Sequence, residues 1–240
     1  MRRALVTGGS GAIGSAICRA LAVARHEVLV HAHRNAKGAD AVASSIVAAG
    51  GRARTVVFDV TDPESVNASL SRESSPEPIQ IVVHGAGYAD DAPLAGMSPE
   101  QWRGVIDVIL HGFYNVTRPL LMPMIRSRWG RIVNVVSVAA LTGNRGQANY
   151  AAAKAGVIAA AKSLAREVAR KGITVNNVAP GIIDTPMAHE AFDSARVAEL
   201  VPMQRMGTPE EVAAVVAFLA SEEASYISGE TISVNGAMYS

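Results

Sequence analysis

The sequence predicts an α/β fold: a Rossmann-like, doubly wound parallel sheet of about seven strands with helices on both faces. Short β-branched runs alternate with longer helical patterns along the whole chain, as in βαβ units. The first run, residues 4–7, ends in a glycine-rich turn at residues 8–14, and a helix follows with Ile17, Leu21 and Ala24 on one side. This order presents backbone N–H groups and a helix N-terminus to a pyrophosphate. The alternative is a tight turn without a ligand.

The remaining elements follow in order along the chain. Strands are expected at residues 27–32, 54–58, 79–83, 131–136, 174–178 and 231–234, and helices at about residues 37–49, 102–122 and 150–171. Polar caps followed by proline indicate helix starts in the segments 61–64, 98–101 and 208–211. Residues 71–78 are interpreted as a loop rather than a domain boundary, and residues 184–207 as a flexible loop over the carboxyl end of the sheet.

Composition agrees with a single domain over residues 1–240. Apolar residues make up 49% of the chain and charged residues 18%, which indicates a folded globular protein. A formal net charge of +1 gives no electrostatic reason to expect nucleic acid or an anionic membrane as partner. No apolar run reaches the roughly 18 residues of a membrane span. The one cysteine, Cys18, is interpreted as a buried hydrophobe, which suits a reducing, cytoplasmic compartment, and no metal site is expected.

The end of the second strand carries information about the cofactor. It reads His33, Arg34, Asn35 and has no carboxylate. In a dinucleotide fold an acidic residue here accepts a hydrogen bond from the ribose 2′-OH, whereas a cation suits a 2′-phosphate. Arg34, with His33 and Asn35, therefore favours NADP(H) over NAD(H). The alternative is that Arg34 is a solvated loop charge, because no basic residue in the glycine turn supports it.

Tyr150 and Lys154 lie one turn apart on the alanine-rich helix predicted from residue 150. An ammonium near a phenol stabilises the phenolate, so we expect the pKa of Tyr150 to be lowered toward neutrality and the side chain to exchange a proton. An isolated pair with this spacing is more often a surface pair. Ser137, which ends the fifth strand, reaches the same crevice, where it either binds a substrate carbonyl or merely caps the strand.

Taken together, these motifs resemble those of the short-chain dehydrogenase/reductase superfamily over essentially the whole chain. The resemblance rests on the glycine motif at 7–14, Asp59, Ala86-Gly87, Ser137, Tyr150-x-x-x-Lys154, Pro180-Gly181-x-Ile183-x-Thr185 and Val234-Asn235-Gly236. Segments 146–156 and 228–231 most resemble the 3-oxoacyl-[acyl-carrier-protein] reductase branch.

The resemblance implies reduction of a 3-oxoacyl thioester on acyl carrier protein by NADPH, in fatty acid or related polyketide-like chain synthesis. Tyr150 would be the general acid, Ser137 would bind the carbonyl oxygen, and Lys154 would bind the nicotinamide ribose and lower the pKa of Tyr150. Contacts with NADP(H) are expected from the strand ends, the glycine turn and the catalytic helix: Gly8, Ser10, Ala12, Ile13, Gly14, His33, Arg34, Asn35, Asp59, Val60, Ala86, Gly87, Tyr150, Lys154, Pro180, Gly181, Ile183 and Thr185.

The resemblance also implies an assembly and a partner. A homotetramer is expected, with the helices near 102–122 and 150–170 forming one interface. Arg128 and Lys171 match basic positions that dock the acidic carrier protein in that branch, and the alternative is that both are ordinary surface charges.

Three positions depart from the family pattern. Ala12 replaces a glycine, His84-Gly85 replaces two asparagines, and Ile109 replaces the catalytic asparagine whose main chain holds a water of the proton relay. Isoleucine removes a polar side chain and could straighten the helix. We therefore expect an active reductase with an altered relay, in which His84 or His111 substitutes in part. A structural or exposed imidazole is the alternative for each histidine.

Two other functions stay open. The first is a reductase or dehydrogenase of a free secondary alcohol or ketone. The second is a weakly catalytic, cofactor-binding subunit that pairs with a competent homologue. Its only support is Ile109 and His84-Gly85, while Ser137, Tyr150 and Lys154 count against it.

Overall fold

The fold is a seven-stranded parallel sheet in the computed structural model, which describes residues 1–74 and 77–239. The strand order is β3-β2-β1-β4-β5-β6-β7. The strands are β1 (Arg3–Thr7), β2 (Glu27–Ala32), β3 (Arg52–Val57), β4 (Ile79–His84), β5 (Gly130–Val135), β6 (Ile173–Pro180) and β7 (Thr231–Val234). The chain winds outward from β1 in one direction and then from β4 in the other, which confirms the predicted doubly wound sheet.

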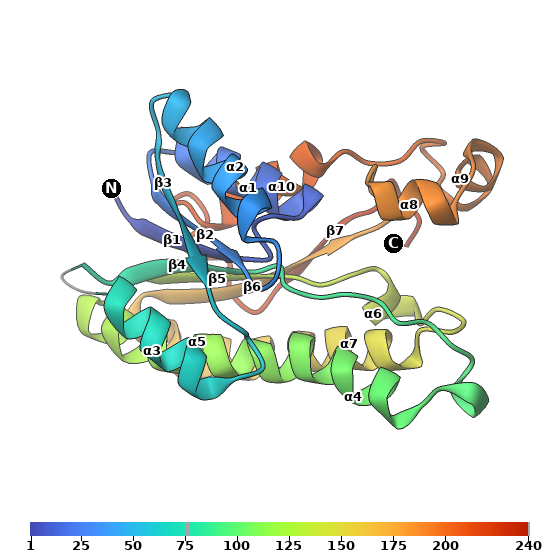
Figure 1. The fold of residues 1–240 in the computed structure, drawn as a ribbon, viewed down its shortest axis with the longest axis horizontal. Helices are drawn as coiled ribbons and strands as arrows, with labels where there is room; N and C mark the ends of the chain where they lie inside the picture. The colour runs from blue at the N-terminus through green and yellow to red at the C-terminus, as the bar shows by residue number, and fades with distance from the viewer. Residues whose placement is uncertain (75–76, 240) are drawn as a thin grey trace.

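Helices cover both faces of this sheet (Figure 1). One layer contains α1 (Ala12–Val23), α2 (Ala36–Ala48) and α10 (Pro209–Leu219), and the other contains α3 (Pro63–Glu73), α4 (Pro99–Ile106), α5 (Gly112–Ser127) and α7 (Ala148–Val168). Each layer seals its own apolar core because strand side chains alternate between the faces. Leu5 and Leu29 belong to the core that also contains residues of α5 and α7, whereas Val6 belongs to the core that contains residues of α1 and α10.

Local sequence explains where the helices begin. Asp62 accepts hydrogen bonds from the backbone of Glu64 and Ser65, and both Ser98 and Thr208 form capping boxes. Each of these three helices has proline in its first turn, as predicted. Cys18 is buried in α1, and burial raises the pKa of its thiol to about 12, which confirms its interpretation as a small hydrophobe.

Several predicted boundaries are wrong. Helix α3 continues to Glu73, so the expected loop over 71–78 is shorter; its residues Ser75 and Pro76 lie outside the described residues. The expected loop over 184–207 contains α8 (Pro186–Ala191) and α9 (Ser194–Leu200), held by a small apolar cluster around Val197 and Val201. The predicted helix over 102–122 is divided among α4, a π-helical segment η2 (Asp107–His111) and α5. The shorter elements are η1 (Leu94–Gly96), α6 (Ala139–Thr142) and η3 (Ala169–Lys171).

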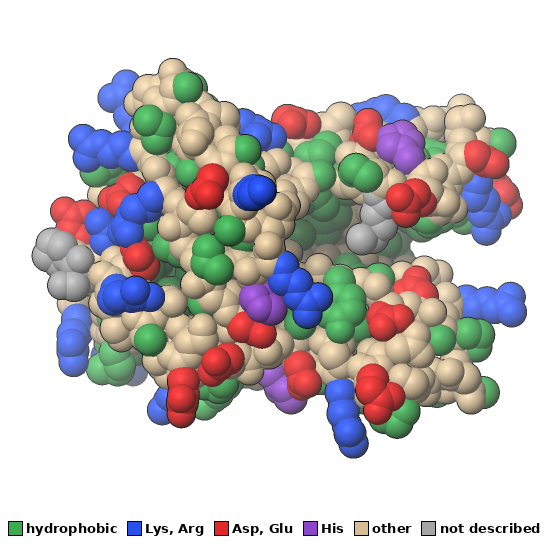
Figure 2. Space-filling view, in the orientation of Figure 1, with side chains coloured by type: hydrophobic (Ala, Val, Ile, Leu, Met, Phe, Trp, Pro, Cys, Tyr) green, Lys and Arg blue, Asp and Glu red, His purple; other side chains and the backbone are tan. Residues whose placement is uncertain are grey.

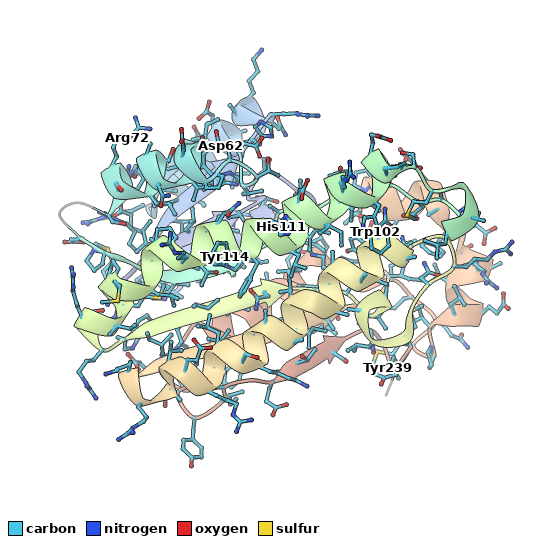
Figure 3. The ribbon with its side chains drawn as sticks, turned by 90° about the horizontal axis from the view of Figure 1, so that it is seen from below. Asp62, Arg72, Trp102, His111, Tyr114 and Tyr239 are labelled. Atoms are coloured by element: carbon cyan, nitrogen blue, oxygen red, sulfur yellow. The ribbon has the colours of Figure 1, made fainter. Side chains whose placement is uncertain are left out.

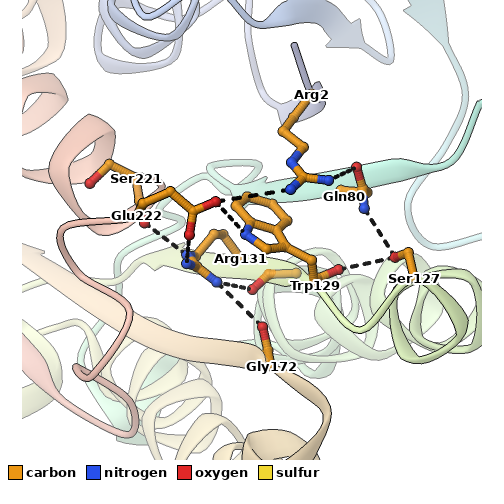
Figure 4. Close-up of polar contacts among 9 residues, drawn as sticks. Arg2, Gln80, Ser127, Trp129, Arg131, Gly172, Ser221 and Glu222 are labelled. Atoms are coloured by element: carbon orange, nitrogen blue, oxygen red, sulfur yellow. Dashed lines mark hydrogen bonds and ion pairs between the residues drawn. The ribbon is translucent and has the colours of Figure 1, made fainter.

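An aromatic and ionic cluster closes the amino-terminal edge of the sheet (Figure 4). The Trp129 ring lies between the guanidinium groups of Arg2 and Arg131, each 4.3 Å from its centroid. Glu222 accepts hydrogen bonds from Trp129 Nε1 at 2.8 Å and from Arg131 at 3.3 Å. The cluster therefore joins the chain start, β5 and the segment after α10 at the edge opposite the strand carboxyl ends. Among the described helices, none is long and apolar enough to cross a membrane.

Candidate active site

Apart from Arg128 and Lys171, the predicted site residues follow the carboxyl ends of strands β1 to β6 or lie at the start of α7. Figure 2 shows the molecule hollowed on this side, between the part that carries α8 and α9 and the part that carries α6 and the start of α7. In open parallel sheets this edge, near the point where the strand order reverses, is where ligands bind. The loops that follow these strands therefore form the candidate site.

The glycine turn is shaped by close backbone contacts. Gly8 has φ +69°, and a Cβ there would lie 2.8 Å from the Gly85 carbonyl oxygen, so only glycine fits. A Cβ on Gly14 would overlap the Gly8 carbonyl group. Ala12 meets no such obstacle, because it is exposed and is the first residue of α1. Thr7 Oγ1 accepts hydrogen bonds from the N–H groups of Gly85 and Ala86, which fixes the turn against the loop after β4.

The residues expected to contact the adenosine end of the cofactor lie near one another, but their side chains make different contacts. Arg34 is exposed, and no ion pair of the described residues includes it. His33 Nε2 lies 3.6 Å from Asp59 Oδ2. Asn35 caps α2 by accepting from the Gly38 N–H at 3.0 Å. Val60 is buried.

Asp59 is held in its charged form. Burial raises the pKa of this carboxyl, but hydrogen bonds from the backbone and hydroxyl of Thr61 lower it, and the net pKa lies below its ordinary value. Both bonds end on Asp59 Oδ1, at 2.9 Å and 2.8 Å. The second carboxylate oxygen, Oδ2, therefore faces His33.

Ser137, Tyr150 and Lys154 meet as the sequence predicts. The Lys154 ammonium lies 5.6 Å from the centroid of the Tyr150 ring and donates to the Val135 carbonyl oxygen at 2.7 Å. The Ser137 side chain lies next to that of Tyr150 and acts to lower the pKa of the phenol. Its Oγ also accepts from the Ala139 N–H at 3.1 Å, so this serine is a cap as well as a tyrosine partner.

Asn149 positions this group, and the sequence interpretation gave it no role. It is fully buried, donates to the carbonyl oxygens of Asp90 and Gln101, and accepts from the Tyr150 N–H at 2.8 Å. These bonds attach the start of α7 to the loop after β4 and to α4. Its place directly before Tyr150 was the only available signal.

The predicted direction of the Tyr150 pKa is wrong for the chain by itself. Burial raises the pKa of Tyr150, the hydrogen bond from Ser137 lowers it, and Asp91 raises it, with a net increase. Burial also lowers the pKa of Lys154 to about 8, so the same apolar surroundings weaken the cation that was expected to stabilise the phenolate.

Ile109 contributes to these surroundings. It is buried, and a Cβ on Gly87 would lie 3.2 Å from Ile109 Cγ1 and 3.6 Å from Lys154 Nζ. The expectation that isoleucine straightens the helix is wrong, because residues Asp107–His111 form a π-helical turn. The wide turn therefore does not require asparagine at this position.

The two histidines near Ile109 face different surroundings. His84 is buried, with Nε2 2.9 Å from Thr117 Oγ1 and its ring against Phe113. Burial, and then the charge of Lys154, lower the pKa of His84 to about 3, so it is neutral. His111 lies on the outer face, where Nδ1 is 2.8 Å from Asp107 Oδ1 (Figure 3). The structure thus favours a surface role for His111.

Residues after β6 close the other side of the site. Gly181 donates to the Val234 carbonyl oxygen at 2.9 Å, and a Cβ on it would lie 2.8 Å from Asn235, so the turn at Pro180-Gly181 needs glycine. Ile183 is buried, and Thr185 Oγ1 caps α8 by accepting from the Ala188 N–H.

Arg128 and Lys171 are not brought to this site. They precede β5 and β6, so they lie at the amino-terminal edge of the sheet. Strand β6 has eight residues, which at about 3.3 Å per residue puts that edge roughly 26 Å from the carboxyl ends. Arg128 donates to the Arg170 carbonyl oxygen. Among the described residues, no group of three or more His, Cys, Asp or Glu side chains could hold a metal ion.

Comparisons with known proteins agree with this arrangement. Residues 8–238 match the family model described as Enoyl-(Acyl carrier protein) reductase. The chain is 45% identical to the 3-oxoacyl-[acyl-carrier-protein] reductase FabG of Vibrio cholerae, with 98% of this chain and 96% of the relative covered. It is 43% identical to the protein of the same name from Escherichia coli, with the same coverage, and 44% identical to that from Pseudomonas aeruginosa, again covering 98% and 96%.

Proposed function

Since this chain belongs to the short-chain dehydrogenase/reductase family, and within it to the 3-oxoacyl-[acyl-carrier-protein] reductases, we propose that it reduces 3-oxoacyl thioesters with NADPH. The carbonyl carbon gains a hydride and its oxygen gains a proton, which gives the 3-hydroxyacyl thioester and NADP⁺. The observation that carries the proposal is the meeting of Ser137, Tyr150 and Lys154 at the carboxyl edge of the sheet.

The site has the features that NADP(H) requires. A Cβ at Gly8 or Gly14 would fill the space of the glycine turn, and α1 starts directly behind it, so a pyrophosphate can approach the backbone. Arg34 supplies an exposed cation for the 2′-phosphate, beside His33 and Asp59. Ile183 and Thr185 follow β6, where they would line the nicotinamide side of the pocket.

The chain's own residues supply and stabilise the proton that the carbonyl oxygen receives. NADPH, when bound, supplies the hydride. The raised pKa of Tyr150 keeps the phenol protonated at neutral pH, so it can donate to the developing alkoxide. Ser137 would hold the carbonyl oxygen within reach of that phenol. Lys154, whose ammonium donates to the Val135 carbonyl oxygen, would hold the ribose and stabilise the phenolate that the proton transfer leaves.

The exposed face of the α4–α5 layer supports the homotetramer that we propose. Trp102, Tyr114 and Met122 of α4 and α5 are 39%, 59% and 53% exposed, and apolar side chains that form a contiguous patch mark interaction surfaces. Figure 3 shows Trp102 and Tyr114 on this layer. We assign this face, with α7, to one interface of a homotetramer.

The chain forms a single domain, and its free, buried Cys18 suits the cytoplasm.

Docking of the acidic carrier protein is assigned to Arg128 and Lys171. Because both lie at the amino-terminal edge, they would serve the site of a neighbouring subunit in the tetramer. Replacing both with glutamate should raise the KM for the carrier-bound substrate at least tenfold and leave the KM for a pantetheine thioester unchanged. The matched control replaces Arg19 and Arg72, which are exposed on other helices. Equal effects of the two double variants would remove the assignment.

The decisive experiment follows NADPH absorbance with the purified protein, offered a 3-oxoacyl thioester on carrier protein, the same group on pantetheine, and a free ketone, with NADH as control. Turnover with a carrier preference supports the proposal. Turnover on the free ketone alone would identify a reductase of free alcohols or ketones. NADPH binding without any turnover would identify a subunit that needs a catalytic partner.

A further inference from the structure

His31 lies in β2, beside the glycine turn, and is 2% exposed. Its ring is fixed by three contacts. Nδ1 is 3.2 Å from the Gly8 nitrogen, Nε2 is 2.9 Å from the Phe58 carbonyl oxygen, and the ring centroid is 4.0 Å from that of Phe58. The imidazole thus bridges the segment after β3 and the turn after β1.

These partners define the tautomer of His31. The Phe58 carbonyl only accepts a hydrogen bond, so Nε2 must carry the proton. The Gly8 backbone N–H only donates, so Nδ1 must offer its lone pair. The ring is therefore neutral, and burial lowers the pKa of His31 to about 4, in agreement with this bonding pattern.

His31 also binds a second N–H group of the glycine turn. The His31 carbonyl oxygen accepts from the Gly9 N–H at 2.9 Å, so His31 binds two successive N–H groups, one through its ring and one through its backbone. By contrast, within the described parts of the chain no acceptor is found for the N–H groups of Ser10, Ala12 and Ile13. His31 thus accepts hydrogen bonds from the first N–H groups of the turn, while the later N–H groups remain free to bind an anion.

We propose that His31 is a positioning residue of the cofactor site, whose Nδ1 lone pair fixes the Gly8 N–H and so sets the glycine turn in the conformation that receives the pyrophosphate of NADP(H). The inference rests on the proposed assignment of this turn to the cofactor. Gly8 needs such support because its φ of +69° lies in the left-handed region and its carbonyl stands against Gly14.

A matched pair of variants tests this role. In His31→Asn the amide oxygen reaches the place of Nδ1 and can accept from Gly8, but nothing reaches Phe58. In His31→Gln the amide nitrogen reaches the place of Nε2 and can donate to Phe58, but Gly8 is left without an acceptor. Both variants lose the ring contact with Phe58, so they differ mainly in the bond that the proposal invokes.

The measurements are the Kd of NADPH from its fluorescence, and kcat and KM with a 3-oxoacyl pantetheine thioester. We expect His31→Gln to raise the Kd and KM for NADPH about tenfold, as for one lost hydrogen bond, with kcat at saturating NADPH unchanged. His31→Asn should stay within about threefold of the native chain. Equal Kd values for both variants, or a greater loss in His31→Asn, would overturn the proposal.

A second measurement needs no variant. Nitrogen-15 NMR of the histidine rings in the full-length protein should show His31 as the Nε2–H tautomer, neutral down to about pH 5. A ring protonated at Nδ1 would overturn the inference even if both variants failed to fold. If the native chain itself does not bind NADPH, the proposed function fails; if it binds and the two variants match it, only the role of His31 fails.

Discussion

Acidification from pH 7 to pH 5 should destabilise the protein through two buried imidazoles. Burial lowers the pKa of His31 to about 4 and that of His84 to about 3, whereas in the unfolded chain each has its ordinary value of about 6.5. Between these values the unfolded chain binds protons that the native chain does not. The free energy of unfolding therefore falls as the pH falls through about 6.5, and the stabilisation is complete only above that pH.

The magnitude follows from the linkage. Each pH unit below about 6.5 costs about 1.4 kcal/mol for each imidazole that stays neutral in the native state. Because the titration is gradual near pH 6.5, the interval from pH 7 to 5 costs about 2 kcal/mol for each histidine and about 4 kcal/mol for the pair. This interval lies above both native pKa values, and ordinary carboxyl groups titrate below it.

Urea unfolding at pH 7 and pH 5, followed by circular dichroism at one protein concentration, measures this difference. The control is the double variant His31→Asn with His84→Asn, which has no imidazole at either position and should lose most of the pH dependence. His26, whose pKa burial also lowers, remains in both proteins and accounts for a residual slope. A native-chain difference below about 1 kcal/mol, or the same difference in the double variant, would refute the reasoning.

Three further predictions concern the site. Tyr150→Phe should lower kcat by about 10³-fold or more with the Kd of NADPH nearly unchanged, and unchanged turnover in the absorbance assay would refute its role as the acid. Arg34→Glu should weaken NADPH by at least tenfold and NADH by less than threefold in fluorescence titrations, whereas equal losses would exclude a contact with the 2′-phosphate. Gly87→Ala should lower kcat about tenfold, because its methyl group would lie only 3.2 Å from Ile109 Cγ1, next to Lys154, and Ile109→Ala in the same chain should restore most of it; no restoration would exclude this contact as the cause.

The elements that rest on local sequence were predictable. The β1–turn–α1 unit, the proline-containing helix starts and the spacing of Tyr150 and Lys154 all depend on residues close together in the chain, and the structure confirms each of them. The π-helical turn at Ile109 was not predictable, because its surroundings include Gly87 and Lys154, which lie on other elements.

Properties that depend on distant partners were missed for the same reason. The sequence identified His31 only as a strand residue. Its tautomer is set by Gly8 and Phe58, which lie 23 and 27 positions away in the chain. Arg128 and Lys171 matched a family pattern, but the direction of β5 and β6 puts them at the edge opposite Tyr150. Sequence similarity therefore identifies such positions, while only the fold says at which edge of the sheet they lie.

Burial connects the fold with the proposed chemistry. The apolar contacts of Ile109 and the depth of α7 leave Lys154 6% exposed, and this lowers the pKa of the lysine while burial raises that of Tyr150. In water the phenol and the ammonium have similar pKa values, but here the raised pKa of Tyr150 lies above that of Lys154. The proton therefore stays on the phenol, which can donate it to the developing alkoxide. Ile109, which is buried beside Gly87, adds apolar surface to this region in place of a polar side chain. The departure that most weakens the family pattern thus supports the tyrosine as acid.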